Sequence, residues 1–117
     1  MLFLEYPPCS TCKKAKKWLD DHAISYEARH IKEENPSYGE LKQWLEESRL
    51  PVKKFFNTGG LLYNSMELKD KLPGMTVEEQ LQLLASDGML VKRPIAVTED
   101  GKILVGFKEK DWQETLL

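Results

Sequence analysis

The residues of this chain best suited to chemistry are its two cysteines, Cys9 and Cys12, in the stretch YPPCSTCKKAKKWL. A Cys-x-x-Cys pair can bind a metal, act as a redox-active dithiol, or fill space in a core. Zinc needs about four ligands, and the chain adds only His22 and His30, which lack the spacing of a paired histidine motif. The pair therefore favours thiol–disulfide chemistry, with a structural pair as the alternative, and predicts no metal and no cofactor.

The position of the pair assigns a role to each cysteine. Ser10 or Thr11 is expected to cap a helix that runs to about Asp21, directly after a short apolar strand. The first N–H groups of a helix are unpaired and carry partial positive charge, so they stabilise a thiolate. Cys9 is then the predicted nucleophile. Cys12, one turn further on, is predicted to resolve the mixed disulfide formed on Cys9.

A run of lysines follows the cysteines, and Lys13 is the first of them. Four lysines stand against two aspartates between residues 9 and 22, a local charge of +2 in a chain with net charge −2. Such a run is most often a solvated helix face, although nearby cations also favour a thiolate. The acidic excess of the whole chain, with a pI of about 5.7, argues against a direct nucleic-acid surface.

The bulk properties are those of one globular domain of 117 residues, with 41% hydrophobic and 31% charged residues. No apolar run approaches the ~20 residues of a membrane span, and the start of the chain has no basic leader or long apolar region typical of a signal peptide. We therefore expect a cytoplasmic protein with no membrane partner, where thiols are kept reduced.

The predicted elements follow the order β-α-β, a helical block, then β-β-α. Apolar and β-rich segments predict strands at 1–6, 25–31, 95–98 and 102–107. Asp100–Gly101 predicts a hairpin between the last two strands. A final helix is expected at 109–116, and the three tryptophans lie at core spacing in their helices. The order predicts an α/β, thioredoxin-like fold with a helical insertion.

The helical block is marked by its capping signals. Ser37 with Glu40, and Thr76 with Glu79, have the spacing of capping boxes. The second of these helices should place Val77, Leu81 and Leu84 on its inner side. It should end at the SDG sequence of residues 86–88, where Gly88 suits a left-handed conformation.

With CSTC at the start of a helix, a helical insertion, and KRPI leading into a late strand followed by VGF, the chain resembles the arsenate reductase (ArsC) family. Within that family it is most similar to the Spx/MgsR-type branch. The resemblance covers essentially the whole chain and implies a single domain. It implies a thioredoxin-like core at about 1–34 and 91–117 and a helical insertion at about 35–90.

The resemblance adds Arg93 and Pro94 to the candidate site. It implies that Arg93 faces the catalytic cysteine and that the Arg93–Pro94 bond is cis. The candidate catalytic residues are thus Cys9, Cys12 and Arg93. Candidates for stabilising the thiolate or binding an oxyanion are Ser10, Thr11, Lys13 and Pro94.

Departures from the family's pattern bear on the substrate. Arsenate reductases that work with glutaredoxin carry a histidine where this chain has Glu5, and an arginine where it has Lys13. Two further arginines of their oxyanion site correspond to the Thr58–Gly60 stretch and to the Phe107–Lys108 pair. Lysine cannot reproduce arginine's planar two-pronged grip on an oxyanion. The resemblance therefore implies poor arsenate reduction at most.

Three functions follow as hypotheses. The first is a thiol–disulfide oxidoreductase with a thiol partner, which would be glutaredoxin, thioredoxin or glutathione. The second is a redox-sensing regulator that, like the Spx proteins, docks on the RNA polymerase α subunit. The landmarks of that docking surface are missing here, because the loop SRLPVKK has no glycine and Gly59 replaces an arginine after Thr58. The third is a binding or structural protein with incidental cysteines.

Overall fold

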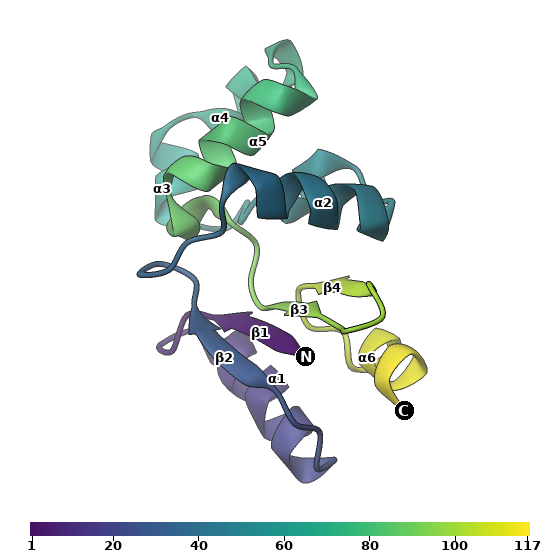
Figure 1. Cartoon of the computed structure of the whole chain (residues 1–117). Coiled ribbons are helices and arrows are strands. Elements are labelled where there is room, and N and C mark those ends of the chain that lie inside the picture. Colours follow the sequence, from purple (N-terminus) through teal and green to yellow (C-terminus); the bar gives the residue numbers. More distant parts are fainter.

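A computed structural model describes all 117 residues of the chain (Figure 1). The strands are β1 (Leu2–Glu5), β2 (Glu27–His30), β3 (Ile95–Val97) and β4 (Ile103–Val105). The α-helices are α1 (Ser10–Asp21), α2 (Tyr38–Ser48), α3 (Leu61–Ser65), α4 (Leu68–Lys71), α5 (Val77–Ser86) and α6 (Glu109–Leu116). Short 3-10 helices are η1 (Val52–Phe55), η2 (Leu72–Gly74) and η3 (Gly88–Leu90). The predicted order of elements is confirmed.

The four strands form one mixed sheet in the order β2-β1-β3-β4. β1 and β2 are parallel, as expected for strands joined through α1, whereas β3 runs antiparallel to β1 and to β4. The predicted hairpin joins β3 and β4, and Gly101 adopts a φ of 85° in its turn. With the helical segment α2 to η3 inserted between β2 and β3, this is a thioredoxin-like fold.

Neighbouring residues of each strand serve two separate cores, because side chains alternate between the faces of a sheet. Leu4 and Ile95 belong to a cluster of 14 buried residues shared with the inserted helices. Phe3 and Ala96 belong to a cluster of 7 shared with α1 and α6. The sheet thus lies between the insertion on one face and α1 with α6 on the other (Figure 1).

The tryptophans and the capping boxes are as predicted. Trp18, Trp44 and Trp112 are all buried and pack in the two cores. The indole Nε1 of Trp112 also donates a hydrogen bond to the Gly106 carbonyl at 3.1 Å, which ties α6 to the end of β4. Both capping boxes are complete, with reciprocal hydrogen bonds at the start of α2 and of α5.

Two predictions about α5 are wrong. Val77 is 52% exposed, and Gln80 lies on the inner side in its place, where its Nε2 donates to the Met75 carbonyl at 3.1 Å. Gly88 is not left-handed, since only Gly101 and Gly106 among the glycines have positive φ. Its backbone instead lies directly against the Ile31 carbonyl group, leaving no room for a side chain.

None of the helices is both long and apolar enough to span a membrane.

Candidate redox site

Cys9 is itself the N-cap of α1, with φ −73° and ψ 125°. Its carbonyl accepts the first hydrogen bond of the helix, from Lys13 N–H at 3.0 Å. No side chain caps this end, so the expectation that Ser10 or Thr11 would cap the helix is wrong. Because Cys9 takes the extended N-cap conformation, its side chain lies beside the unpaired N–H groups of the first turn.

The turn after β1 brings the two cysteines together. The Cys9 N–H donates to the Tyr6 carbonyl at 2.9 Å, and the Tyr6 N–H donates to Sγ of Cys12 at 3.5 Å. Both cysteines are free thiols, with Cys9 half-buried and Cys12 buried. The end of one strand therefore contacts the main chain of Cys9 and the sulfur atom of Cys12.

The pKa of Cys9 is lowered from its ordinary value. Burial is the largest single influence and acts to raise it. Several groups favour the thiolate and so oppose burial. They are the Cys12 N–H and side chain, the nearby Arg93 side chain and the Thr11 N–H. Together they outweigh the desolvation, so Cys9 is the more readily ionised thiol.

The pKa of Cys12 moves the other way and is raised to about 12. Burial is again the largest cause, and the neighbouring Cys9 adds to it because two adjacent thiolates repel each other. The Tyr6 N–H and the charge of Arg93 lower it in part. In the reduced site, Cys9 is therefore the readily ionised thiol and Cys12 stays protonated.

Arg93 lies on the approach to β3 and reaches this site from a distant part of the chain. Its bond to Pro94 is cis, as the resemblance implies. Its Cζ lies 5.0 Å from the centroid of the Tyr6 ring. Two of its donors, Nε and Nη1, are buried and have no hydrogen-bond partner, so they are free to bind an anionic group at the site.

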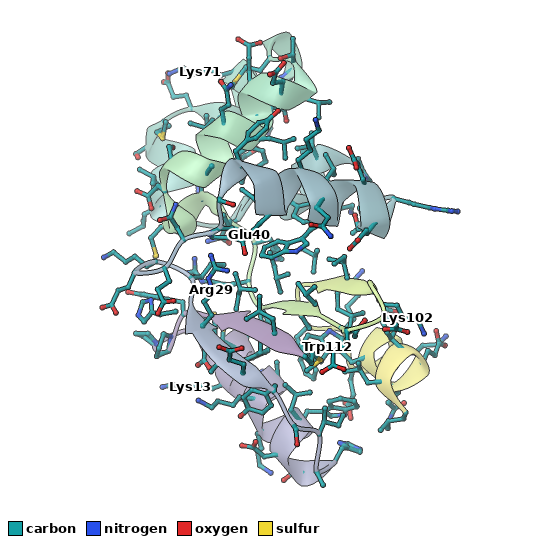
Figure 2. All side chains as sticks on the ribbon, in the orientation of Figure 1. Lys13, Arg29, Glu40, Lys71, Lys102 and Trp112 are labelled. Carbon is teal, nitrogen blue, oxygen red and sulfur yellow. The ribbon has the colours of Figure 1, made fainter.

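The lysine run contributes little to the enclosed part of the site. Lys13 is exposed on α1 (Figure 2). Lys16 instead forms an ion pair with the buried Glu5 at 3.4 Å, and Lys17 pairs with Asp21 at 2.8 Å. The groups that lower the pKa of Cys9 are amides, Cys12 and Arg93, and the run has the character of a solvated helix face.

The remaining predicted residues contribute unequally. Thr11 acts through its backbone N–H, whereas Ser10 is the exposed first residue of α1. Pro94 is buried and leads into β3. That the side chain of Ser10 or Lys13 stabilises the thiolate or binds an oxyanion stays a prediction.

Sequence reasoning missed Tyr6. This residue contacts Cys9, Cys12 and Arg93, yet its only sequence signal is its place at the end of a strand, just before the two prolines.

A groove of about 770 Å³ lies along β4, between η1 and α6. Thr58 and Lys108 line it, but Cys9, Cys12 and Arg93 do not. Neither the Thr58–Gly60 stretch nor the Phe107–Lys108 pair contains an arginine. No group of three or more His, Cys, Asp or Glu side chains gathers where it could hold a metal ion.

Comparison with known proteins agrees with this fold. The sequence matches the ArsC family over residues 4–115. It is 52% identical to the uncharacterized protein YusI of Bacillus subtilis, covering 97% of this chain and 96% of YusI. It is 33% identical to the regulatory protein MgsR of the same bacterium, covering 92% and 82% of the two chains.

A structure from Bacteroides fragilis, solved as an ArsC-family-related protein, superposes with a TM-score of 0.94. It is 57% identical, and the match covers 97% of this chain and 94% of that one. With the family match over nearly the whole length and relatives in its Spx/MgsR branch, the chain belongs to the ArsC family.

Proposed function

We propose that this chain is a cytoplasmic thiol–disulfide oxidoreductase. The thiolate of Cys9 attacks one sulfur of a substrate disulfide, which releases the other sulfur as a thiolate and leaves a mixed disulfide on Cys9. Cys12 then attacks Sγ of Cys9, releases the second substrate thiol and forms the Cys9–Cys12 disulfide. The substrate gains two electrons, and a thiol partner such as glutaredoxin, thioredoxin or glutathione returns them to the pair.

The observation that carries this proposal is the placement of the two thiols, with Cys9 as the N-cap of α1 and Cys12 buried one turn inside the helix. Cys9 is ionised more readily than an ordinary thiol, as a nucleophile must be, whereas Cys12 is kept protonated. When Cys9 enters a mixed disulfide, its negative charge disappears and no longer opposes ionisation of Cys12. The Tyr6 N–H and the charge of Arg93 still favour the Cys12 thiolate. Burial still raises the pKa of Cys12, but the first step removes the part of the shift that comes from Cys9, so the resolving thiol ionises more readily after that step than before it.

Arsenate is at most a poor substrate in this proposal. Arg93 is the only arginine of the family's oxyanion set that the chain keeps. Its two unpartnered donors can bind one edge of an anion, but a tetrahedral oxyanion needs further donors around it. A disulfide or glutathione mixed disulfide needs only a reactive thiolate and a resolving thiol.

The test is turnover of a glutathione mixed disulfide with glutathione or thioredoxin as reductant. Cys9→Ser should abolish turnover, because it removes the nucleophile. With no reductant added, Cys12→Ser should keep the first step and trap the mixed disulfide on Cys9, visible as a mass increase of the intact protein. Equal turnover by wild type and Cys9→Ser would overturn the proposal.

A second candidate is a redox-responsive regulator that binds the RNA polymerase α subunit. Similarity to MgsR, a regulatory protein, favours it. The missing glycine in the loop after α2 and the presence of Gly59 after Thr58 count against that surface. A pull-down with the α C-terminal domain, with the pair oxidised and reduced, decides. Binding in either state would support the regulator, and its absence in both states would exclude it.

A further inference from the structure

We propose that Tyr6 is a positioning residue that holds the guanidinium of Arg93 beside Cys9. The inference rests on the proposed function, since it concerns how the nucleophilic thiolate is stabilised. Tyr6 is the last residue before the Pro7–Pro8 turn, and it contacts each of the other three members of the site.

The main chain of Tyr6 accounts for two of these contacts, and any residue could make them. Its carbonyl accepts from the Cys9 N–H, and its N–H donates to Sγ of Cys12. The third contact, to Arg93, needs the side chain. The aromatic ring is therefore the part of Tyr6 whose identity matters.

The ring is what orients Arg93. The Cζ of Arg93 lies 5.0 Å from the Tyr6 ring centroid, within the distance of a cation–π interaction. Nε and Nη1 are buried without hydrogen-bond partners, so hydrogen bonds from these two donors do not set the guanidinium's direction. The contacts that remain to orient it are the face of the Tyr6 ring and the side-chain hydrogen bond between Arg93 and Cys9, and they leave Nε and Nη1 free for an anionic group of the substrate.

The Tyr6 ring is itself supported by a second aromatic side chain. It packs edge-on against His30, at 5.8 Å between ring centroids and an interplanar angle of 85°. His30 is fixed in turn, because its Nδ1 accepts from the N–H groups of Lys32 and Glu33, each at 3.2 Å. The turn after β2 thus braces His30, His30 braces Tyr6, and Tyr6 braces Arg93.

Loss of the ring should raise the pKa of Cys9. Without an aromatic face, the guanidinium is free to turn toward water and spends less time beside the thiolate. Tyr6→Leu removes the ring but keeps an apolar side chain, whereas Tyr6→Phe keeps the ring. The two variants separate the aromatic face from the hydroxyl group.

The experiment measures the rate at which iodoacetamide alkylates Cys9 as a function of pH, with the site identified by mass spectrometry. Below the pKa, that rate is proportional to the thiolate fraction. Tyr6→Leu should lower it about three- to thirtyfold, the range that corresponds to a cation–π contact. Tyr6→Phe should stay within about twofold of wild type. If Tyr6→Leu does not fold, as judged by thermal melting, Tyr6→Met gives the same loss of an aromatic face.

The Arg93→Ala background is the decisive control. If Tyr6 acts through Arg93, the ring-removing substitution should have no further effect on the Cys9 pKa once Arg93 is gone. An equal effect in both backgrounds would overturn the inference, as would an effect of Tyr6→Phe as large as that of Tyr6→Leu.

Failure of this inference is distinguishable from failure of the proposed function, because the pKa of Cys9 is measured without a substrate. A dependence on Tyr6 without turnover in the wild type would refute only the proposed function. Turnover with no dependence of the Cys9 pKa on Tyr6 would refute only the positioning role.

Discussion

The two cysteines are chemically alike, and their surroundings make them different. Cys9 caps a helix and gains the support of amides and Arg93, although partial burial opposes it. Cys12 lies one turn inside the helix, 1% exposed, where ionisation has little solvent support. Two cysteines only three positions apart in the sequence therefore have thiol pKa values shifted in opposite directions.

Selective alkylation checks this difference directly. At pH 7, iodoacetamide should modify Cys9 and leave Cys12 intact, because the pKa of Cys9 is lowered whereas that of Cys12 is raised to about 12. In denaturant both thiols should react at similar rates, since each then has a pKa of about 8.5. Peptide mass spectrometry gives the occupancy of each site. Faster modification of Cys12 than of Cys9 in the folded protein would contradict the assignment of roles.

At the scale of elements, the ends of helices and strands position the residues of the site and join the insertion to the sheet. β1 ends in a turn that feeds α1, and the Arg93–Pro94 segment leads into β3 beside it. The end of α5 is joined to the end of β2 in a different way, since Gly88 packs directly on the main chain of Ile31 and Lys32. That contact seats the last inserted helix against the sheet.

Gly88→Ala tests this junction. A Cβ at position 88 would press into the Ile31 carbonyl group and stand 3.0 Å from Cα of Lys32. Because backbone cannot move aside as a flexible side chain can, we expect a loss of about 1–3 kcal/mol in the free energy of unfolding. Gly74→Ala is the matched control, with nothing within 4 Å of its Cβ, and should leave stability unchanged or raise it by up to about 1 kcal/mol. Urea denaturation measures both, and equal stability of the two variants would refute the contact.

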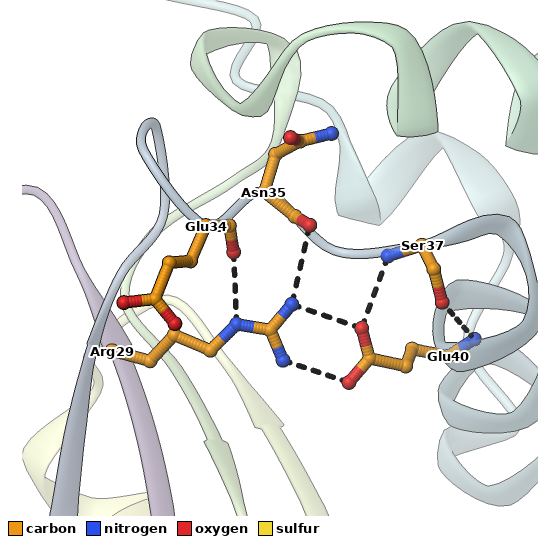
Figure 3. Close-up of polar contacts among 5 residues, drawn as sticks. All are labelled: Arg29, Glu34, Asn35, Ser37 and Glu40. Atoms are coloured by element: carbon orange, nitrogen blue, oxygen red, sulfur yellow. Dashed lines mark hydrogen bonds and ion pairs between the residues drawn. The ribbon is translucent and has the colours of Figure 1, made fainter.

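At the scale of the whole molecule, the sheet and the insertion are joined by Arg29 at β2 and Glu40 in α2 (Figure 3). Both terminal nitrogens of Arg29 donate to the Glu40 carboxylate, at 2.7 and 2.9 Å. Its Nε and Nη2 also donate to the carbonyls of Glu34 and Asn35. Glu40 also completes the capping box with Ser37. The Arg29–Glu40 ion pair therefore holds both the segment between β2 and α2 and the start of α2.

Arg29→Lys should destabilise the protein by about 1–2 kcal/mol at pH 7, because lysine loses the bidentate grip, while partial exposure of the pair reduces its effect. The pKa of Glu40 is lowered, chiefly by its hydrogen bonds from Arg29. The stability that this carboxylate contributes is thus present above its unfolded pKa, about 4.3, and is lost as pH falls through the lowered folded pKa. The difference between wild type and variant should therefore shrink below pH 4, as measured by urea unfolding at several pH values.

Lys17→Gln is the control for this experiment. Its ion pair with Asp21 is short, 2.8 Å, but the side chains are 76% and 57% exposed. Its removal should leave stability nearly unchanged. A loss as large as that of Arg29→Lys would show that charge pairing in general, and not this junction, stabilises the fold.

Much of the fold was predictable because its signals are local. A capping box needs residues three positions apart, a hairpin needs its turn dipeptide, and a redox pair at a helix start needs only its own few residues. The order of strands and helices, the Asp100–Gly101 turn, the caps at Ser37 and Thr76, and the place of Cys9 at the start of α1 were all read correctly from such patterns.

What only the tertiary structure decided involves residues far apart in the chain. That Tyr6 faces Arg93 depends on the pairing of β1 with β3. That Arg29 binds Glu40 and that Gly88 lies on the Ile31 carbonyl depend on how the insertion packs on the sheet. The exposure of Val77, wrongly predicted as buried, has the same origin. The local sequence pattern predicts which face of a helix is apolar. Which residues of that face are covered, and by which neighbour, depends on how the whole chain packs.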